Sequence, residues 1–181
     1  ADDAAAGNQD NNASYREIYI GNPSASTYYL CTGSSLPIPN CSIVLSYPTR
    51  RGKAAIRAWK DADPTVVETD IRVPGEGLFI LAADARPTGA GTWRYRYALQ
   101  NLNSDRSARS FSVQFPQGGT VESIVFHDVE YHSGEPYEGT DWEAVFDGQS
   151  LTWSTASYAV NPNANALRYD AIYSFSFESN V

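Results

Sequence analysis

Apolar and polar residues alternate with a period of two along most of the chain. The clearest run is TWRYRYALQ at residues 92–100, in which every second position is aromatic or leucine. Side chains two positions apart share one face of a strand, so this run predicts a strand with one buried face and one face in water. Similar runs predict ten further strands, at residues 15–20, 42–47, 54–59, 65–71, 77–85, 108–115, 120–127, 141–146, 151–154 and 171–178.

Clusters of glycine and proline separate these runs, as in VPGEG at residues 73–77 and PQGG at 116–119. No stretch repeats apolar residues at helical spacing over three turns, and residues 163–167 are the best candidate for a single helical turn. About ten short strands divided by such turns favour two packed antiparallel sheets. We therefore predict an all-β, antiparallel, two-sheet β-sandwich of immunoglobulin-like or jelly-roll-like type. It forms one domain over residues 15–181, after a polar arm at 1–14.

The composition agrees with a folded domain and argues against two kinds of partner. Hydrophobic residues make up 42% of the 181 and aromatic residues 13%, which is enough to fill a core. The 21 acidic and 13 basic residues give a net charge of −8, which repels the phosphates of nucleic acids. No apolar run approaches the roughly 20 residues of a membrane-spanning helix. The sequence thus predicts no nucleic-acid partner and no membrane span.

The two cysteines, Cys31 and Cys41, flank the turn-rich segment TGSSLPIPN. A metal site built on these thiols would lack a second pair of ligands, so we predict one disulfide. A disulfide indicates an oxidising compartment. The chain also opens at Ala1 on a polar segment, which indicates that a leader or an upstream region has been removed. We expect a secreted protein, extracellular or at the cell surface.

Metal-binding side chains are densest at residues 126–142. This segment holds both histidines of the chain and several carboxylates, and our candidate ligands are His127, His132, Asp128, Glu135 and Asp141. Imidazole with carboxylate suits zinc, copper or iron, although the spacing matches no established ligand motif. The alternative is an ordered loop in which the histidines form hydrogen bonds and the aspartates hold turns.

A second candidate site is the segment NPNANALR at residues 161–168. Its amide and carbonyl oxygens suit a structural calcium ion if acidic residues of the arm, such as Asp2 or Asp10, come close. The alternative is an ordered connection built on Asx turns, in which Arg168 pairs with a nearby carboxylate.

Two further groups of residues have a structural and a functional interpretation. The arginines in and around residues 101–107 form either a solvated face or intramolecular ion pairs. The aromatic residues form either the core or a face on which sugars stack. These groups are Arg94, Arg96, Arg106 and Arg109, and Tyr28, Tyr29, Trp59, Trp93, Trp142 and Trp153.

Several runs of the sequence stand out together: FHDVEYHSGEPY at residues 126–137, NPNANALR at 161–168, VPGEGLFI at 73–80, NLNSDRS at 101–107, and DDAAAGN with NNASYR in the opening arm. These runs resemble a family of uncharacterised secreted bacterial proteins of the planctomycete type. The resemblance implies that this region is the C-terminal part of a longer exported protein. The family has no assigned reaction, so the resemblance implies no catalytic residues.

We predict a non-enzymatic extracellular module with a structural, assembly or binding role, because no complete catalytic motif is present. Its partner would be a glycan, another extracellular protein or a second copy of the chain. Free sheet edges favour such assembly. The competing hypothesis is a metal-binding protein or metalloenzyme that uses His127, His132 and a carboxylate, with Tyr131 or Tyr137 as proton donor.

Overall fold

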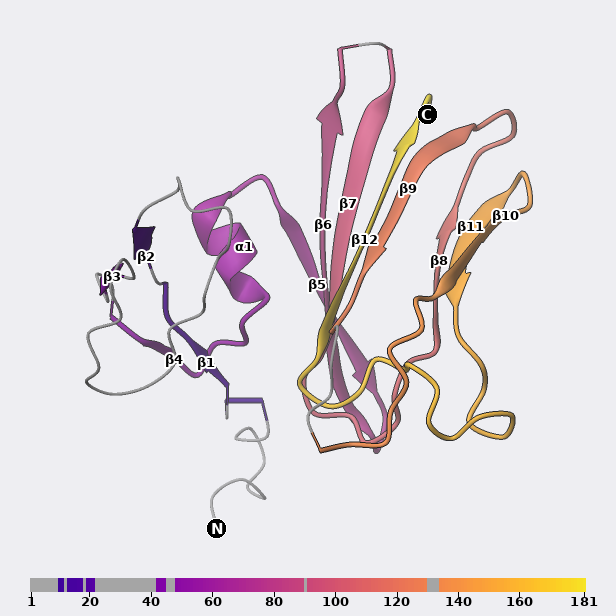
Figure 1. Cartoon of the computed structure of the whole chain (residues 1–181). Helices are drawn as coiled ribbons and strands as arrows, with labels where there is room; N and C mark the ends of the chain where they lie inside the picture. The colour runs from indigo at the N-terminus through magenta and orange to yellow at the C-terminus, as the bar shows by residue number, and fades with distance from the viewer. Residues whose placement is uncertain are drawn as a thin grey trace.

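A computed structural model of the chain describes residues 10–11, 13–17, 19–21, 42–44, 48–89, 91–129 and 134–181 (Figure 1). Strands dominate these residues, with a single short helix, so the predicted all-β class is confirmed. No helix in the described part of the chain has the length and apolar character to span a bilayer. The elements are β1 Ser14–Tyr15, β2 Tyr19–Gly21, β3 Ser42–Val44, β4 Arg50–Arg51, α1 Arg57–Ala62, β5 Val67–Val73, β6 Gly77–Pro87, β7 Trp93–Asn101, β8 Ser110–Gln114, β9 Val121–His127, β10 Glu143–Phe146, β11 Ser150–Ser154 and β12 Ile172–Ser179.

Two antiparallel sheets make up most of the described structure. The larger has five strands in the order β5-β6-β7-β12-β9, and the smaller has three in the order β10-β11-β8. Strands β1 with β4, and β2 with β3, form two further small pairs. In Figure 1 the three-stranded sheet lies beside β9 and β12, and α1 lies on the opposite side of the large sheet.

The face of the large sheet toward the small sheet, which we call the inner face, carries the main core. Tyr173, Phe175 and Phe177 of β12 alternate with polar residues and are almost fully buried. Phe175 stacks on Phe111 of β8 with ring centroids 4.6 Å apart. Each such ring contributes about 1.5–3 kcal/mol by burial, so aromatic packing holds the two sheets together.

The opposite face of the large sheet, which we call the outer face, carries a second, smaller core. Leu78, Ile80 and Ala82 of β6 are buried there against Ile56 and Val66, which lie on either side of α1. The backbone N–H of Ile56 also donates to the side chain of Gln100, at 3.3 Å. The segment around α1 therefore covers part of the outer face. Because of this cover, β6 has apolar residues buried on both faces of the sheet.

One predicted strand is wrong. Residues 54–59 were expected to form a strand, but Ala54 and Ile56 belong to turns that lead into helix α1. Successive bonds join Arg57 N–H to Ala54 O at 3.1 Å and Trp59 N–H to Ile56 O at 3.1 Å. Over so short a run, apolar residues fit both a strand period and a helix period, and the contacts with β6 favour the helix.

Some predictions lie outside the described residues. Cys31 and Cys41 are among these, so their disulfide stays a prediction. The strands expected at 15–20 and 42–47 are described only in part, as β1, β2 and β3. The helical turn expected at 163–167, in contrast, lies within the described residues and is wrong, because this segment is irregular and forms no helix.

Candidate functional site

The predicted metal-binding segment begins where β9 ends. His127 is the last residue of that strand, is exposed, and pairs across the sheet with Ser174. Asp128 instead accepts a hydrogen bond from the side-chain amide of Asn165, which belongs to the NPNANALR segment. The two segments predicted as separate sites are therefore joined by this contact.

Asn165 is a buried centre of hydrogen bonds. Its amide also donates to the carbonyl of Thr140 at 3.0 Å, and its Oδ1 accepts from the hydroxyl of Tyr173 at 2.5 Å. Its backbone carbonyl accepts from the indole N–H of Trp142. Burial, and then the carboxylate of Asp128, raise the pKa of Tyr173, so this hydroxyl keeps its proton and donates it. Asp128 thus contacts a distant segment of the chain, a contact that neither interpretation of this loop predicts.

The metal site itself stays a prediction. Glu135 and Asp141 are exposed, and His132 lies outside the described residues. Among the residues that the structure describes, no three His, Cys, Asp or Glu side chains gather closely enough to hold an ion. In the second segment, Asn161 Oδ1 accepts from the backbone N–H of Asn163 at 3.0 Å, which is an Asx turn.

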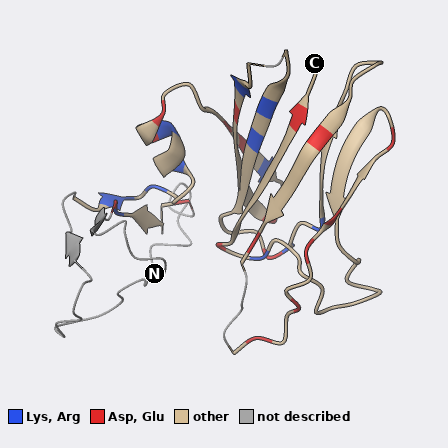
Figure 2. Cartoon of the chain, turned by 45° about the horizontal axis from the view of Figure 1, so that its top comes forward, with Lys and Arg blue, Asp and Glu red and all other residues tan. Residues whose placement is uncertain are grey.

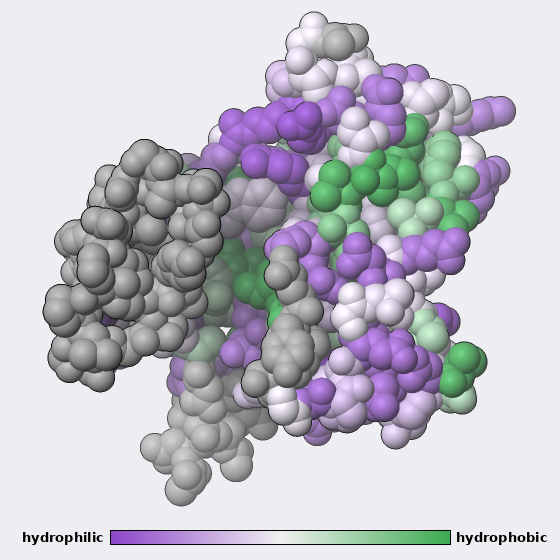
Figure 3. All heavy atoms as spheres, viewed as in Figure 1, coloured by the Kyte–Doolittle hydropathy of each residue, from purple (hydrophilic) through white to green (hydrophobic). Residues whose placement is uncertain are grey.

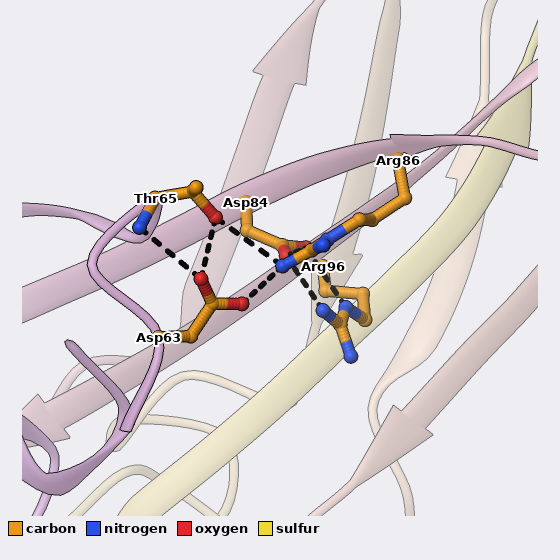
Figure 4. A network of polar contacts seen from close by, with 5 residues as sticks. All are labelled: Asp63, Thr65, Asp84, Arg86 and Arg96. Carbon is orange, nitrogen blue, oxygen red and sulfur yellow. Dashed lines mark hydrogen bonds and ion pairs between the residues drawn. The ribbon is translucent and has the colours of Figure 1, made fainter. Parts of the chain in front are cut away.

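The arginines on the outer face form intramolecular ion pairs. Figure 2 shows basic residues gathered on β6 and β7 and acidic residues on the neighbouring strands. The buried carboxylate of Asp84 accepts two hydrogen bonds from Arg96, at 2.8 and 2.6 Å, and one from Arg86 at 2.8 Å (Figure 4). Arg86 also contacts Asp63, which lies between α1 and β5. This network fixes the α1 segment to the sheet, so these arginines have a structural role.

A pocket lies at one end of the large sheet, between the β7–β8 and β11–β12 connections. We call it the loop pocket; its volume is about 360 Å³. Asn101 joins the two connections, because its side-chain amide donates to Ser104 O at 3.0 Å and to Leu167 O at 3.3 Å. The described lining residues are Asp105, Arg106, Ser107, Arg109, Ala156, Tyr158, Asn161, Pro162, Ala164, Ala166 and Arg168.

Three guanidinium groups line the loop pocket, and they have different partners. Arg106 pairs with Glu76 at 2.8 Å. Arg168 lies over the ring of Tyr137, 3.4 Å from its centroid, and donates to the carbonyl of Ala164 at 3.0 Å. Arg109 is exposed and forms no side-chain hydrogen bond or ion pair with any residue in the described ranges. Arg109 is therefore the cation in this pocket whose charge is free to meet a ligand.

Apolar surface completes the loop pocket. Three alanines and a proline line it, and Tyr158 at its edge is 80% exposed. An exposed tyrosine ring offers a flat apolar surface with a polar hydroxyl. The pocket can thus accept a flat ligand that carries a negative charge.

Arg106, Arg109 and the NPNANALR segment stand out in the sequence, but no pattern in it places them together. Tyr158 does not stand out, because a lone tyrosine in a connection carries no motif. The four tryptophans divide as the alternatives allowed. Trp142 and Trp153 are core, Trp59 is half-buried against the core of the outer face, and Trp93 is 43% exposed. No family model, no curated protein and no solved structure matches this chain.

Proposed function

We propose that this chain is a non-enzymatic binding module of a secreted protein, with its two packed sheets forming a β-sandwich that carries the loop pocket. The ligand class that we propose is an anionic saccharide, bearing a carboxylate or a sulfate group. The observation that carries the proposal is the combination, in one pocket, of an arginine that has no ion-pair partner among the described residues and an exposed tyrosine ring.

The charge of the loop pocket supports an anionic ligand. The chain as a whole has a net charge of −8, yet Arg106, Arg109 and Arg168 face one carboxylate, Asp105, among the described lining residues. A guanidinium binds a carboxylate or a sulfate through two parallel hydrogen bonds. Glu76 already neutralises Arg106, and the carbonyl contacts of Arg168 hold it in place. Arg109 is therefore the group that we expect to pair with the ligand.

The shape and the apolar lining support a saccharide. A volume of about 360 Å³ lies within the usual range for small-ligand sites, about 300–1,000 Å³. The C–H face of a pyranose ring packs well on an aromatic side chain, and Tyr158 offers such a face. Loops at the end of a rigid sheet are a common place for binding residues.

Binding without catalysis is supported by the chemistry of the described lining. Glycoside hydrolysis by the usual route needs two carboxyl groups, about 5–10 Å apart. The described lining residues include only Asp105 as a carboxylate. The secreted location that we infer from the sequence suits a ligand found on cell surfaces and in extracellular matrices.

Titration calorimetry with a panel of polysaccharides tests the proposal. The panel contains alginate and polygalacturonate as carboxylates, heparin as a sulfate ester, and dextran as the neutral polymer. We expect binding to at least one anionic polymer and none to dextran, with affinity that falls as salt rises. The variants Arg109→Ala and Tyr158→Ala should each weaken binding by about tenfold or more.

Two matched substitutions control for general loss of charge or aromatic surface. Arg94→Ala removes an exposed arginine on the outer face, and Tyr169→Ala removes a tyrosine that is 63% exposed and is not among the lining residues. Both should bind as the wild type does. Equal binding by the Arg109→Ala variant, or equal losses in Arg94→Ala and Arg109→Ala, would contradict a site in the loop pocket.

A further inference from the structure

The loop pocket contains a second charged side chain that has no partner among the described residues, the carboxylate of Asp105. Asp105 is exposed and lines the pocket together with Arg109. Neither side chain forms a hydrogen bond or an ion pair with any residue in the described ranges, and the two do not pair with each other. A ligand that fills this pocket therefore meets both a guanidinium and a carboxylate.

The backbone on both sides of Asp105 is held in place. Asn101 is fully buried, and its Oδ1 accepts from the backbone N–H of Ser104 at 2.8 Å. The amide of Asn101 donates to the carbonyl of Ser104 at 3.0 Å, and the hydroxyl of Ser104 donates to the carbonyl of Arg106 at 3.0 Å. Asp105 thus combines a fixed backbone with a carboxylate that these bonds do not use.

Other aspartates in connections show what a structural role requires. Asp147 accepts from the backbone N–H groups of Gln149 and Ser150, at 2.8 and 2.7 Å. Asp63 likewise accepts from the backbone N–H of Thr65 at 3.1 Å. Such bonds are the usual way in which an aspartate stabilises a turn. Asp105 accepts none from the described residues, so the turn does not account for its carboxylate.

The backbone next to Arg109 is fixed as well. Ala108 exchanges two backbone hydrogen bonds with Leu167, at 3.2 and 2.8 Å, and the carbonyl of Arg109 accepts from the N–H of Thr155 at 3.0 Å. Both charged side chains therefore start from fixed backbone positions. A ligand that binds them does not have to order the connection first, which lowers the entropic cost of binding.

A carboxylate next to an anion site favours a particular kind of anionic sugar. Asp105 can accept hydrogen bonds from two hydroxyl groups, and bonds to an ionised acceptor are stronger than neutral ones. It also repels any second anionic group of the ligand. A pyranose ring with one acid group and free neighbouring hydroxyls can satisfy both Arg109 and Asp105. A densely sulfated sugar brings a second anion toward Asp105 and has fewer hydroxyls to donate.

The surroundings of the loop pocket suit a ligand that is rich in hydroxyls. On the side of the molecule shown in Figure 3, hydrophilic residues predominate at the end where the β11–β12 connection lies, and hydrophobic residues gather nearer to the other end. Ser107 and Asn161 also contribute a hydroxyl and an amide to the lining. Polar groups of this kind orient a ligand through hydrogen bonds.

We propose that the loop pocket recognises a uronate residue of a saccharide, whose carboxylate pairs with Arg109 and whose vicinal hydroxyls donate to Asp105. This inference rests on the saccharide-binding function proposed above and narrows it. Polymers such as alginate and polygalacturonate, which keep a carboxylate and a vicinal hydroxyl pair on each ring, should bind more tightly than heparin. Asp105 is then the residue that determines specificity, and Arg109 the residue that attracts the acid group.

Titration calorimetry with oligosaccharides of equal length tests the proposal. The probes are an oligogalacturonate, the same oligomer with its hydroxyls acetylated, and a heparin fragment. The wild type should bind the oligogalacturonate about tenfold or more tightly than either of the others. In Asp105→Ala both differences should shrink to about threefold or less, because the hydroxyl contact and the repulsion are both lost. A purely steric effect of the acetyl groups would persist in this variant.

A matched control removes a carboxylate elsewhere. Glu122→Ala changes an exposed residue of β9 at the other end of the large sheet, where it pairs across the sheet with Glu178. It should keep the preference of the wild type. Thermal melting confirms that each variant is folded, and Asp105→Asn, which removes the charge and keeps the shape of the side chain, provides a second test if Asp105→Ala melts lower.

Two results would overturn the proposal and leave the saccharide function intact. One is a wild type that binds the heparin fragment as tightly as the oligogalacturonate. The other is an unchanged preference in Asp105→Ala. In both cases, binding that Arg109→Ala abolishes would still place an anionic saccharide in the loop pocket. If the wild type binds none of the probes, the saccharide function itself is wrong, and the inference is wrong with it.

Discussion

The two faces of the large sheet are covered in different ways. Aromatic rings from both sheets pack on the inner face. Phe175, for example, contacts four of them: Phe111, Phe126, Trp142 and Trp153. The outer face is covered in part by the α1 segment, and the rest carries ion pairs such as the one between Arg96 and Asp84. One face therefore depends on shape and burial, and the other on local contacts and charge.

This difference implies that the two faces contribute unequally to the free energy of unfolding. Burial of aromatic rings is worth several kcal/mol per residue, whereas ion pairs that are partly exposed are worth much less. The inner face should therefore determine whether the domain folds. The charged contacts of the outer face should determine where the α1 segment lies. Substitutions on the two faces can test this division.

Phe175→Ala should be the most damaging change. It removes a ring that is 2% exposed at the centre of the inner face and leaves a cavity between the sheets. We expect a loss of about 3–5 kcal/mol in the free energy of unfolding, measured by urea denaturation. A loss below about 1 kcal/mol would mean that the two sheets do not share this core.

Ile56→Ala should have a smaller and more local effect. Ile56 is 4% exposed and belongs to the second core against β6. We expect a loss of about 2–4 kcal/mol, confined mainly to the α1 segment. Hydrogen exchange should show faster exchange at residues 54–66, with β7 and β12 still protected. Equal loss of protection in β12 would indicate a single cooperative unit instead.

Asp84→Asn tests the ion-pair network and its dependence on pH. Hydrogen bonds from Arg96, and then from Arg86, hold the pKa of Asp84 below its usual value. This stability is present above the unfolded pKa of about 3.9 and is lost as the pH falls below it. Because both arginines are about half exposed, we expect a loss of only about 1–3 kcal/mol at pH 7. Urea denaturation between pH 7 and pH 2.5 should show a shallower decline for the variant than for the wild type.

Tyr173→Phe removes a hydroxyl that donates to Asn165. Its effect should depend on pH in the alkaline range, whereas that of Asp84→Asn depends on pH in the acidic range. Burial raises the pKa of Tyr173, so its contribution is present below the unfolded pKa of about 10 and is lost as the pH rises above it. We expect a loss of about 1–2 kcal/mol at pH 7. The stability of the wild type should then fall toward that of the variant above about pH 10. Parallel declines of the two proteins would show that folding does not raise the pKa of Tyr173.

Val125→Ala should be almost neutral. Val125 is 53% exposed on β9, so little apolar area is lost. We expect a change within about 0.5 kcal/mol by the same denaturation assay. A loss above about 1.5 kcal/mol would reveal a cover over this side of the sheet that the described residues do not provide.

Much of the large sheet was predictable because its strands carry strict alternation. The run at residues 92–100 became β7, with Tyr95 and Tyr97 on the inner face and Arg94 and Arg96 on the outer face, as its period requires. The α1 segment was not predictable in the same way. Its apolar residues are few. The contact that favours the helix joins Ile56 to β6, a strand that follows only after β5, so the local sequence does not indicate it.

The candidate site was predictable only in fragments. The segment at residues 161–168 and the arginines Arg106 and Arg109 were visible in the sequence. Their meeting depends on the bridge between Ala108 and Leu167, which joins two distant connections. No periodicity encodes that contact. The exposure of Tyr158, and the lack of an ion-pair partner for Arg109 within the part of the chain that the structure describes, are properties of the folded chain and could be seen only in its structure.

The most direct test of the loop pocket is to map the ligand on the protein. Amide NMR spectra of the full chain, recorded while the anionic saccharide that binds best is added, locate the residues that respond. We predict shifts concentrated at residues 105–109 and 156–168, and their loss in the Arg109→Ala variant. Shifts concentrated instead on the outer face around Arg94 and Arg96, or equal shifts in Arg109→Ala, would contradict the account.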